Sequence, residues 1–77
     1  MTDINQALAK SINKFRLAAK LSQEELADTA DIHRTYVSQI ERGLKSPTLH
    51  VLFNIASALD VRASDIIQEI EKEVYEL

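Results

Sequence analysis

The chain of 77 residues contains no cysteine, one glycine and one proline. The absence of cysteine excludes disulfides, thiolate metal sites and thiol catalysis. Glycine and proline are the residues that most often interrupt helices. Their scarcity, together with aliphatic residues that recur at intervals of three and four, predicts an all-α protein with a single domain over residues 1–77. A domain of this size buries little apolar surface, so association with another chain is a natural way to bury more.

Long apolar runs are also missing. The longest uninterrupted apolar segments extend over a few residues, far short of the roughly 20 that a membrane-spanning helix needs. The first ten residues, MTDINQALAK, contain no apolar core of the kind found in secretory signals. We therefore expect a soluble, cytoplasmic protein with no membrane partner.

An excess of basic charge is absent as well, since the formal net charge is −3. Residues 1–59 nevertheless carry seven Lys or Arg against six Asp or Glu, whereas residues 60–77 carry two against six. The acidity is thus concentrated near the C-terminus. Affinity for DNA depends on where basic side chains meet phosphates, so the net charge is only weak evidence against DNA binding.

Five helices are predicted from apolar spacing and capping residues, over about residues 4–20, 22–30, 33–42, 48–59 and 64–75. Asp3, Ser22 and Thr48 are the expected N-caps, and Glu25 completes a capping box with Ser22. The residues expected to face inward in the first four helices are Leu8, Ile12, Phe15 and Ala19; Leu26, Ala27 and Ala30; Val37 and Ile40; and Leu49, Leu52, Ile55, Ala56 and Leu59.

The segment from Ser22 to Gly43, SQEELADTADIHRTYVSQIERG, is predicted to form a helix, a tight turn and a second helix. Gly43 is expected to end that helix in the left-handed conformation, which glycine adopts without steric cost. The exposed side of the second helix carries Arg34, Thr35, Tyr36, Ser38 and Gln39. Side chains of these types hydrogen-bond base edges and phosphates in a DNA major groove. The segment therefore predicts DNA binding.

Three motifs fall in register along the chain: Gln23-Glu-Glu-Leu-Ala27, Val37-Ser-Gln-Ile-Glu-Arg-Gly43, and Ser46-Pro-Thr-Leu49 leading to Ile55-Ala-Ser-Ala-Leu59. They resemble the Cro/repressor (XRE-type) helix-turn-helix family over about residues 5–67. The resemblance implies a compact five-helix, lambda-repressor-like domain. His33-Arg-Thr-Tyr-Val-Ser38 is most similar to the small controller proteins of restriction–modification systems, which are dimers that bind operator repeats. Two glycines usual in the family are Asp31 and Asp60 here, and Asp tolerates a left-handed backbone better than most residues.

Base contacts are predicted for all five of the exposed residues. The Arg34 guanidinium can pair with O6 and N7 of a guanine, and Thr35 and Gln39 suit a thymine methyl, an adenine or a phosphate. Ser38 shares their surface. For Tyr36 two alternatives stay open: its ring lies against DNA, or it packs against the scaffold and exposes only its hydroxyl. The simpler interpretation of the polar members is ordinary solvated surface.

Contacts to the DNA backbone are predicted for Gln23, His33, Arg42 and Lys45, with solvated polar surface as the alternative. Gln23 begins a helix whose free N–H groups attract phosphate, and the resemblance places this residue at a phosphate too. His33 is expected either to cap its helix or to contact a phosphate. With only His50 besides it and no cysteine, no metal site is predicted, and no cofactor.

Two residues are implied by the resemblance to be structural: Arg16 and Glu41 form a salt bridge between the first and third helices of the family. Glu24 and Asp28, four residues apart, match the position of an acidic patch through which some repressor-type activators contact the sigma subunit of RNA polymerase. Simple solubility is the alternative for this acidic pair, and both interpretations stay open.

The last predicted helix carries an apolar stripe of Ile66, Ile67, Ile70, Val74 and Leu77, with Glu69, Glu71, Lys72, Glu73 and Glu76 on its wet side. Part of the stripe is expected to cover the domain's own core. The remainder predicts a symmetric dimer interface, and dimers match palindromic half-sites in double-stranded DNA.

The sequence thus predicts a sequence-specific, dimeric transcription regulator. A protein-interaction module, such as an antitoxin with the same helix-turn-helix, is the alternative from another class. An enzyme is disfavoured, because no nucleophile–base pair, phosphate loop or metal-ligand set can be assembled from these residues.

Overall fold

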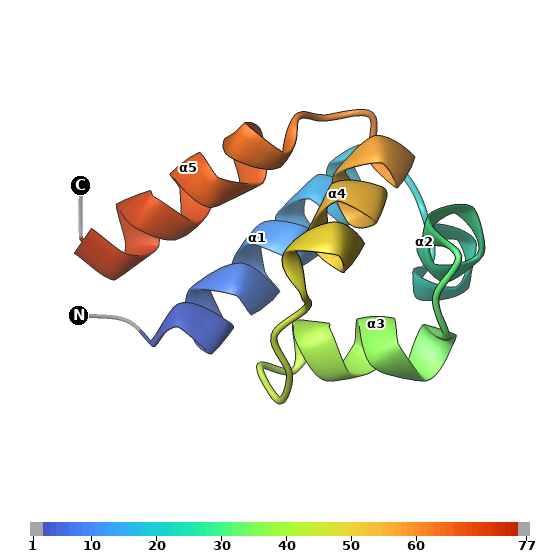
Figure 1. The fold of residues 1–77 in the computed structure, drawn as a ribbon, viewed down its shortest axis with the longest axis horizontal. Coiled ribbons are helices and arrows are strands. Elements are labelled where there is room, and N and C mark those ends of the chain that lie inside the picture. The colour runs from blue at the N-terminus through green and yellow to red at the C-terminus, as the bar shows by residue number, and fades with distance from the viewer. Residues whose placement is uncertain (1–2, 76–77) are drawn as a thin grey trace.

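Five helices make up the computed structural model, which describes residues 3–75, and no strand occurs in that range (Figure 1). They are α1 (Ile4–Ala18), α2 (Gln23–Ala30), α3 (Arg34–Glu41), α4 (Leu49–Ala58) and α5 (Ala63–Tyr75). The all-α, five-helix prediction is confirmed. The predicted ends differ by one or two residues: α1 stops at Ala18, α3 starts at Arg34 and α5 starts at Ala63.

Three helices, α1, α2 and α4, begin directly after the residues that the sequence marks as N-caps. The Asp3 side chain accepts a hydrogen bond from the Asn5 N–H, and the Thr48 side chain accepts one from the Val51 N–H. The capping box is complete, because Ser22 Oγ accepts from the Glu25 N–H while a Glu25 carboxylate oxygen accepts from the Ser22 N–H. Each bond satisfies an N–H group that the helix itself leaves free.

The first four helices end in one common way, with a left-handed residue just past the last turn. These residues are Lys20, Asp31, Gly43 and Asp60, with φ between 58° and 74°. In each case the N–H of the following residue bonds back five positions, as from Leu21 to the Arg16 carbonyl oxygen at 3.1 Å. The expected left-handed turns at Asp31 and Asp60 are confirmed, and the one at Lys20 was not foreseen.

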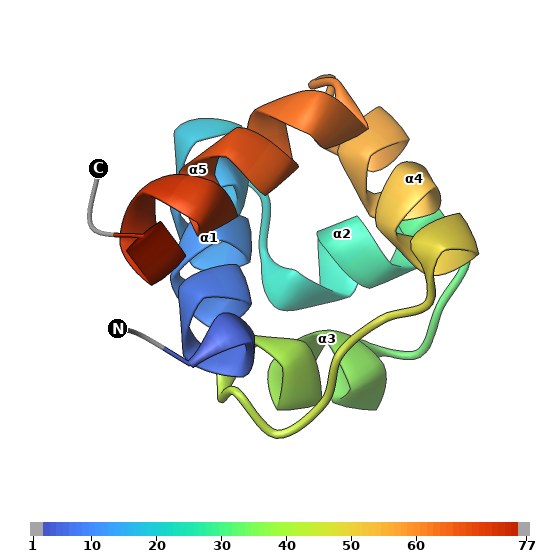
Figure 2. The ribbon, with the colours of Figure 1, turned by 60° about the vertical axis from the view of Figure 1, so that its left-hand side comes forward.

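The core lies where all five helices meet. Its fully buried large side chains are Ile12, Leu26, Val37, Ile40, Ile55 and Ile66. α1 and α5 lie side by side, and α2 and α4 close the other flank above α3 (Figures 1 and 2). The start of α1 and the end of α5 are at the same end of the molecule, where Lys10 forms an ion pair with Glu73.

The prediction of an inward-facing side chain is wrong for two residues, Ala19 and Leu49. Ala19 is exposed because α1 has already ended at Ala18 and the chain turns at Lys20. Leu49 is 68% exposed because it opens α4, one turn before the segment that packs on the core. The remaining predicted residues are buried, except Phe15, which is half-buried against the core.

Candidate nucleic-acid interface

The first turn of α3 is the most exposed part of the predicted recognition helix. Asp31, at φ 59°, reverses the chain between α2 and α3. α3 then lies on the outside of the molecule, on the far side from α5 (Figures 1 and 2). Arg34 and Thr35 are both exposed in its first turn. Their side chains are therefore accessible to the edge of a DNA groove.

The other three residues predicted to contact bases, Tyr36, Ser38 and Gln39, are half-buried. Tyr36 packs against the core, because it lies one turn before Ile40 on the inner side of the helix. Part of the Tyr36 side chain thus belongs to the scaffold, and a contact of its remaining surface with DNA stays a prediction. Ser38 and Gln39 keep part of their surface, so their base contacts stay predictions.

His33 occupies the N-cap position of α3, but its side chain makes no capping hydrogen bond. His33 is therefore the N-cap residue by position, but the expectation that its side chain caps the helix is wrong. Ser, Thr, Asp and Asn serve as caps because a short side chain brings an oxygen next to the free N–H groups, and an imidazole does not provide that geometry. The exposed ring leaves the phosphate contact as a prediction.

A buried ion pair holds α3 against α1. Arg16 Nε donates to Glu41 Oε2 at 2.7 Å and a terminal guanidinium nitrogen donates to Oε1 at 2.9 Å, which confirms the predicted salt bridge. The two side chains are only 12% and 5% exposed. The other guanidinium nitrogen donates to the Leu21 carbonyl oxygen at 2.8 Å, so the same arginine also secures the turn after α1. The pair is bidentate, the geometry in which Arg and carboxylate interact most strongly.

Glu41 is the centre of a wider network that the sequence did not reveal in full. Asn13 donates from its amide to Glu41 Oε1 at 3.0 Å, and Gln23 donates to the same oxygen at 3.3 Å. Three helices, α1, α2 and α3, thus meet at one carboxylate. The position of Asn13, three residues before Arg16 and hence on the same helix face, is the one signal that could have placed it there.

These contacts keep the pair charged. Burial raises the pKa of Glu41, but hydrogen bonds from Arg16, Asn13 and Gln23 and the positive charge of Arg16 outweigh it, so the net pKa lies below the ordinary value. The hydrogen bond to Glu41 raises the pKa of Arg16. Both shifts favour the ionised forms. Glu41 is therefore a structural anion and no DNA contact.

The predicted phosphate-binding residues surround α3. Gln23, the first residue of α2, has one amide N–H directed to Glu41, which leaves its second N–H for a phosphate. Arg42 and Lys45 are exposed beyond the end of α3, and Arg42 Nε donates to the Ser38 carbonyl oxygen at 3.4 Å. The backbone-contact predictions for these three residues are compatible with their positions and remain untested.

Glu24 and Asp28 are both exposed on α2, one helical turn apart. No ion pair between residues 3 and 75 involves either of them. Their carboxylates therefore face solvent, as both solubility and contact with another protein would require.

The apolar stripe of α5 divides into core and surface. Ile66 is 0% and Val74 9% exposed, whereas Ile67 is 40% exposed and Ile70 half-buried. The assignment of Ile66 to a dimer interface is wrong, because its side chain already lies in the core of the single chain, and Val74 has little surface to offer. Ile67 and Ile70 instead line a groove of about 300 Å³ that α5 forms with the start of α1, the segment before α4 and α4 itself. Leu77 lies outside the described residues.

Neither histidine lies in a metal-binding cluster. Across residues 3–75, no group of three or more His, Asp or Glu side chains could hold an ion. Over the same range no helix has the length and apolar character to cross a membrane.

A short outer helix with an exposed, cationic first turn, packed at a tight turn against the helix before it, is the architecture of a helix-turn-helix DNA-binding regulator. The chain belongs to the helix-turn-helix family HTH_3, whose sequence profile matches residues 12–66. The Cro/repressor-type resemblance is thereby confirmed. Proteins of this family are transcription regulators and not enzymes.

Its similar relatives include proteins of restriction–modification systems. The chain is 35% identical to control protein C.SmaI of Serratia marcescens over 84% of this chain and 77% of that protein. It is 36% identical to control protein C.MunI of a Mycoplasma species over 95% of this chain and 100% of that protein. The crystal structure of the restriction–modification controller protein C.Esp1396I matches with a TM-score of 0.85 and 29% identity, covering 97% of this chain and 99% of that one.

Proposed function

We propose that this protein is a controller of a restriction–modification system that binds a two-fold symmetric operator as a homodimer. The proposal is supported by the agreement in length and sequence with C.MunI, which this chain matches over 95% of its residues. Relatives that share a whole chain, and not only the helix-turn-helix, share the context in which that motif acts.

The observation that carries the DNA-reading part of the proposal is the placement of Arg34. Its guanidinium is exposed in the first turn of α3, while Glu41, two turns further on, is locked to Arg16. The recognition helix is thus held in place at its C-terminal end and exposed to solvent at its N-terminal end. A fixed helix presents Arg34 and Thr35 to bases in one defined orientation, which sequence-specific readout requires.

In this mechanism, phosphate contacts from Gln23, His33, Arg42 and Lys45 set the register of the protein on the duplex. Arg34, Thr35 and Gln39 then read base edges, and Ser38 adds a hydroxyl to the same surface. A second copy reads the other half-site, one helical turn (about 34 Å) away.

Footprinting on the DNA immediately upstream of the gene that encodes this chain tests the controller proposal. A controller acts on its own operator, so we expect protection of two segments related by a two-fold axis. A uniform, salt-sensitive retention of the fragment without a footprint would contradict the proposal, because it would indicate phosphate contacts without base readout.

The acidic pair Glu24 and Asp28 is proposed as a contact to the sigma subunit of RNA polymerase. This proposal is supported by the exposure of both carboxylates on α2. Glu24→Gln with Asp28→Asn should lower activated transcription in a reconstituted system while operator affinity stays the same. Unchanged activation would assign the pair to solubility alone.

A further inference from the structure

Glu41 ends α3 with a carboxylate whose two oxygens are used unequally. Oε2 accepts one hydrogen bond, from Arg16 Nε at 2.7 Å, whereas Oε1 accepts three. The donors to Oε1 are Arg16 at 2.9 Å, Asn13 at 3.0 Å and Gln23 at 3.3 Å. One oxygen of a buried side chain thus joins α1 to the first residue of α2.

Two side chains of α1 determine where this oxygen lies. A carboxylate oxygen has two lone pairs, and the two shorter bonds to Oε1 come from Arg16 and Asn13. Arg16 binds both oxygens and so fixes the plane of the carboxylate. Asn13 lies one turn earlier on the same face of α1, and its bond restrains Oε1 from a second direction. Gln23 makes the longest of the three bonds, so its amide follows the position of the oxygen.

The bond to Glu41 sets the orientation of the half-buried Gln23 side chain. An ionised carboxylate accepts hydrogen bonds and does not donate them, so it binds the nitrogen end of the amide. The two N–H groups of an amide nitrogen lie in one plane, and binding one of them fixes the direction of the other. A glutamine without this bond is free to turn its carbonyl oxygen toward a phosphate, which accepts hydrogen bonds only.

We propose that Asn13 is a positioning residue for operator binding: it holds Glu41 Oε1 where that oxygen orients the Gln23 amide toward a DNA phosphate. The inference rests on the phosphate contact of Gln23 in the proposed function. Ordering a flexible side chain when a complex forms opposes binding, and here Gln23 is ordered before DNA arrives. The effect of Asn13 on affinity is therefore indirect and requires Gln23.

NMR of the side-chain amides in the free protein tests the positioning without DNA. In the wild-type protein, the Gln23 NH2 signals should be separate from those of Gln68, which is exposed on α5. Asn13→Ala should move the Gln23 signals toward those of Gln68. Gln23 signals that coincide with those of Gln68 in the wild type, or that Asn13→Ala leaves unchanged, would overturn the inference.

A double-mutant cycle on operator affinity tests the consequence for DNA binding. At one salt concentration, Asn13→Ala should raise the dissociation constant of the operator complex about threefold to tenfold. In the Gln23→Ala background, the same change should raise it by less than about twofold. An equal factor in both backgrounds, or no effect in either, would contradict positioning through Gln23.

Ile66→Val is the matched control for a general loss of stability. It removes one methyl group from the core, where Ile66 is 0% exposed, and leaves the hydrogen bonds of Glu41 in place. Urea denaturation should show a loss of stability, while the operator dissociation constant stays within about twofold of the wild-type value. A loss of affinity equal to that of Asn13→Ala would mean that affinity follows stability, and the inference would fall.

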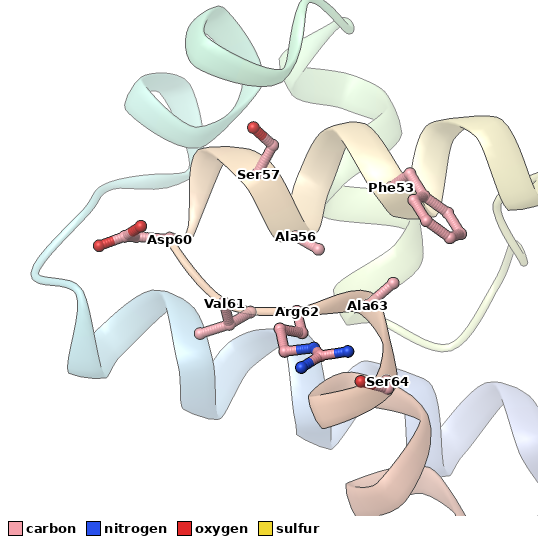
Figure 3. Close-up of a pocket in the computed structure, with 8 residues that line it drawn as sticks. All are labelled: Phe53, Ala56, Ser57, Asp60, Val61, Arg62, Ala63 and Ser64. Atoms are coloured by element: carbon pink, nitrogen blue, oxygen red, sulfur yellow. The ribbon is translucent and has the colours of Figure 1, made fainter.

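The exposed apolar surfaces of the molecule lie away from Asn13. Figure 3 shows the cavity of about 580 Å³ at the junction of α4 and α5, and Asn13 lines neither this cavity nor the groove beside Ile67. Asn13→Ala should therefore leave self-association of the chain unchanged in sedimentation equilibrium. A change in self-association large enough to explain the loss of operator affinity would contradict a role through Gln23.

Failure of this inference is distinguishable from failure of the proposed function. A wild-type protein that protects no operator contradicts the controller proposal, whereas the NMR comparison needs no DNA and still shows whether Asn13 orients Gln23. A protein that protects its operator, but in which Asn13→Ala and Gln23→Ala act independently, overturns only the role of Asn13.

Discussion

At the scale of single residues, Glu41 and Arg16 determine how firmly the recognition helix is held. The pair is buried and bidentate, and the remaining guanidinium nitrogen is bound by the Leu21 carbonyl oxygen. Removal of one partner leaves the other charge buried without compensation, which costs much more than the intact pair contributes. The stability of α3 therefore depends on both residues together.

Arg16→Ala should lower the free energy of unfolding by about 3 kcal/mol, because it strands the Glu41 carboxylate. Urea denaturation of the full chain measures this. The matched control is Lys14→Ala, which removes the exposed ion pair with Glu69 and should have a much smaller effect. Equal losses from the two variants would contradict the buried role of Arg16.

The depressed pKa of Glu41 makes stability depend on pH. The carboxylate has a lower pKa in the folded state than the ordinary value of 4.5. Its contribution is therefore complete above that value and is lost as the pH falls through the folded-state pKa. Urea denaturation between about pH 6 and about pH 3 should show the destabilisation by Glu41→Gln shrinking as the pH falls. A constant difference across that range would show that Glu41 ionisation does not stabilise the fold.

Arg34→Ala should abolish discrimination at one base position while the fold stays intact. The expected loss is about 1–3 kcal/mol of specificity. Competition binding with single-base operator variants measures it. Lys45→Ala is the control, since loss of a phosphate contact should weaken all sequences alike and reduce the salt slope by about one. Unchanged specificity of the Arg34→Ala protein would refute readout by this residue.

At the scale of elements, the ends of the helices show how much local structure the sequence determines. Ser22, Glu25 and Thr48 cap helices as predicted, because each rule depends only on neighbours along the chain. The left-handed turn at Lys20 escaped prediction, because lysine carries no preference for that conformation. There the geometry is imposed by the packing of the helices that the turn connects.

Asp31→Gly and Asp60→Gly should each stabilise the fold by about 0.5 kcal/mol. Both residues have positive φ, which glycine adopts without steric cost, and part of the gain is offset by the freer unfolded chain. Thermal and urea denaturation measure the change. Gln68→Gly, in the exposed interior of α5, is the control and should destabilise by about 0.5 kcal/mol. Destabilisation by both Asp variants would mean that their side chains support the turns.

At the scale of the whole molecule, sequence patterns identified the core better than they identified the surface. Helical spacing placed Leu26, Ile40 and Ile55 in the core, because burial of a periodic stripe follows from the helix alone. Leu49 is exposed because α4 begins there, one turn before its core-facing segment, and Ile66 is buried because α5 packs on α1 and α4. The spacing of apolar residues within one helix contains neither piece of information. For this reason the predicted dimer surface on α5 wrongly included Ile66, which lies in the core.

In the candidate site, too, some features were predictable from the sequence and others depend on how the helices pack. The helix-turn-helix motif predicted five exposed residues on α3, of which Arg34 and Thr35 are exposed and the other three half-buried. The family resemblance implied the pair of Arg16 and Glu41, which the structure contains. The contacts of Asn13 and Gln23 with Glu41 join residues far apart in the chain. Such contacts are set by how three helices meet, so they became visible only in the fold.

Selection of bound sequences from a random pool of double-stranded DNA, at one stated salt concentration, tests the central claim most directly. The account predicts enrichment of a two-fold symmetric consensus whose half-sites lie about one helical turn apart. Arg34→Ala protein should lose the preference at one base pair of each half-site. Recovery of no consensus by the wild-type protein would contradict sequence-specific recognition by α3.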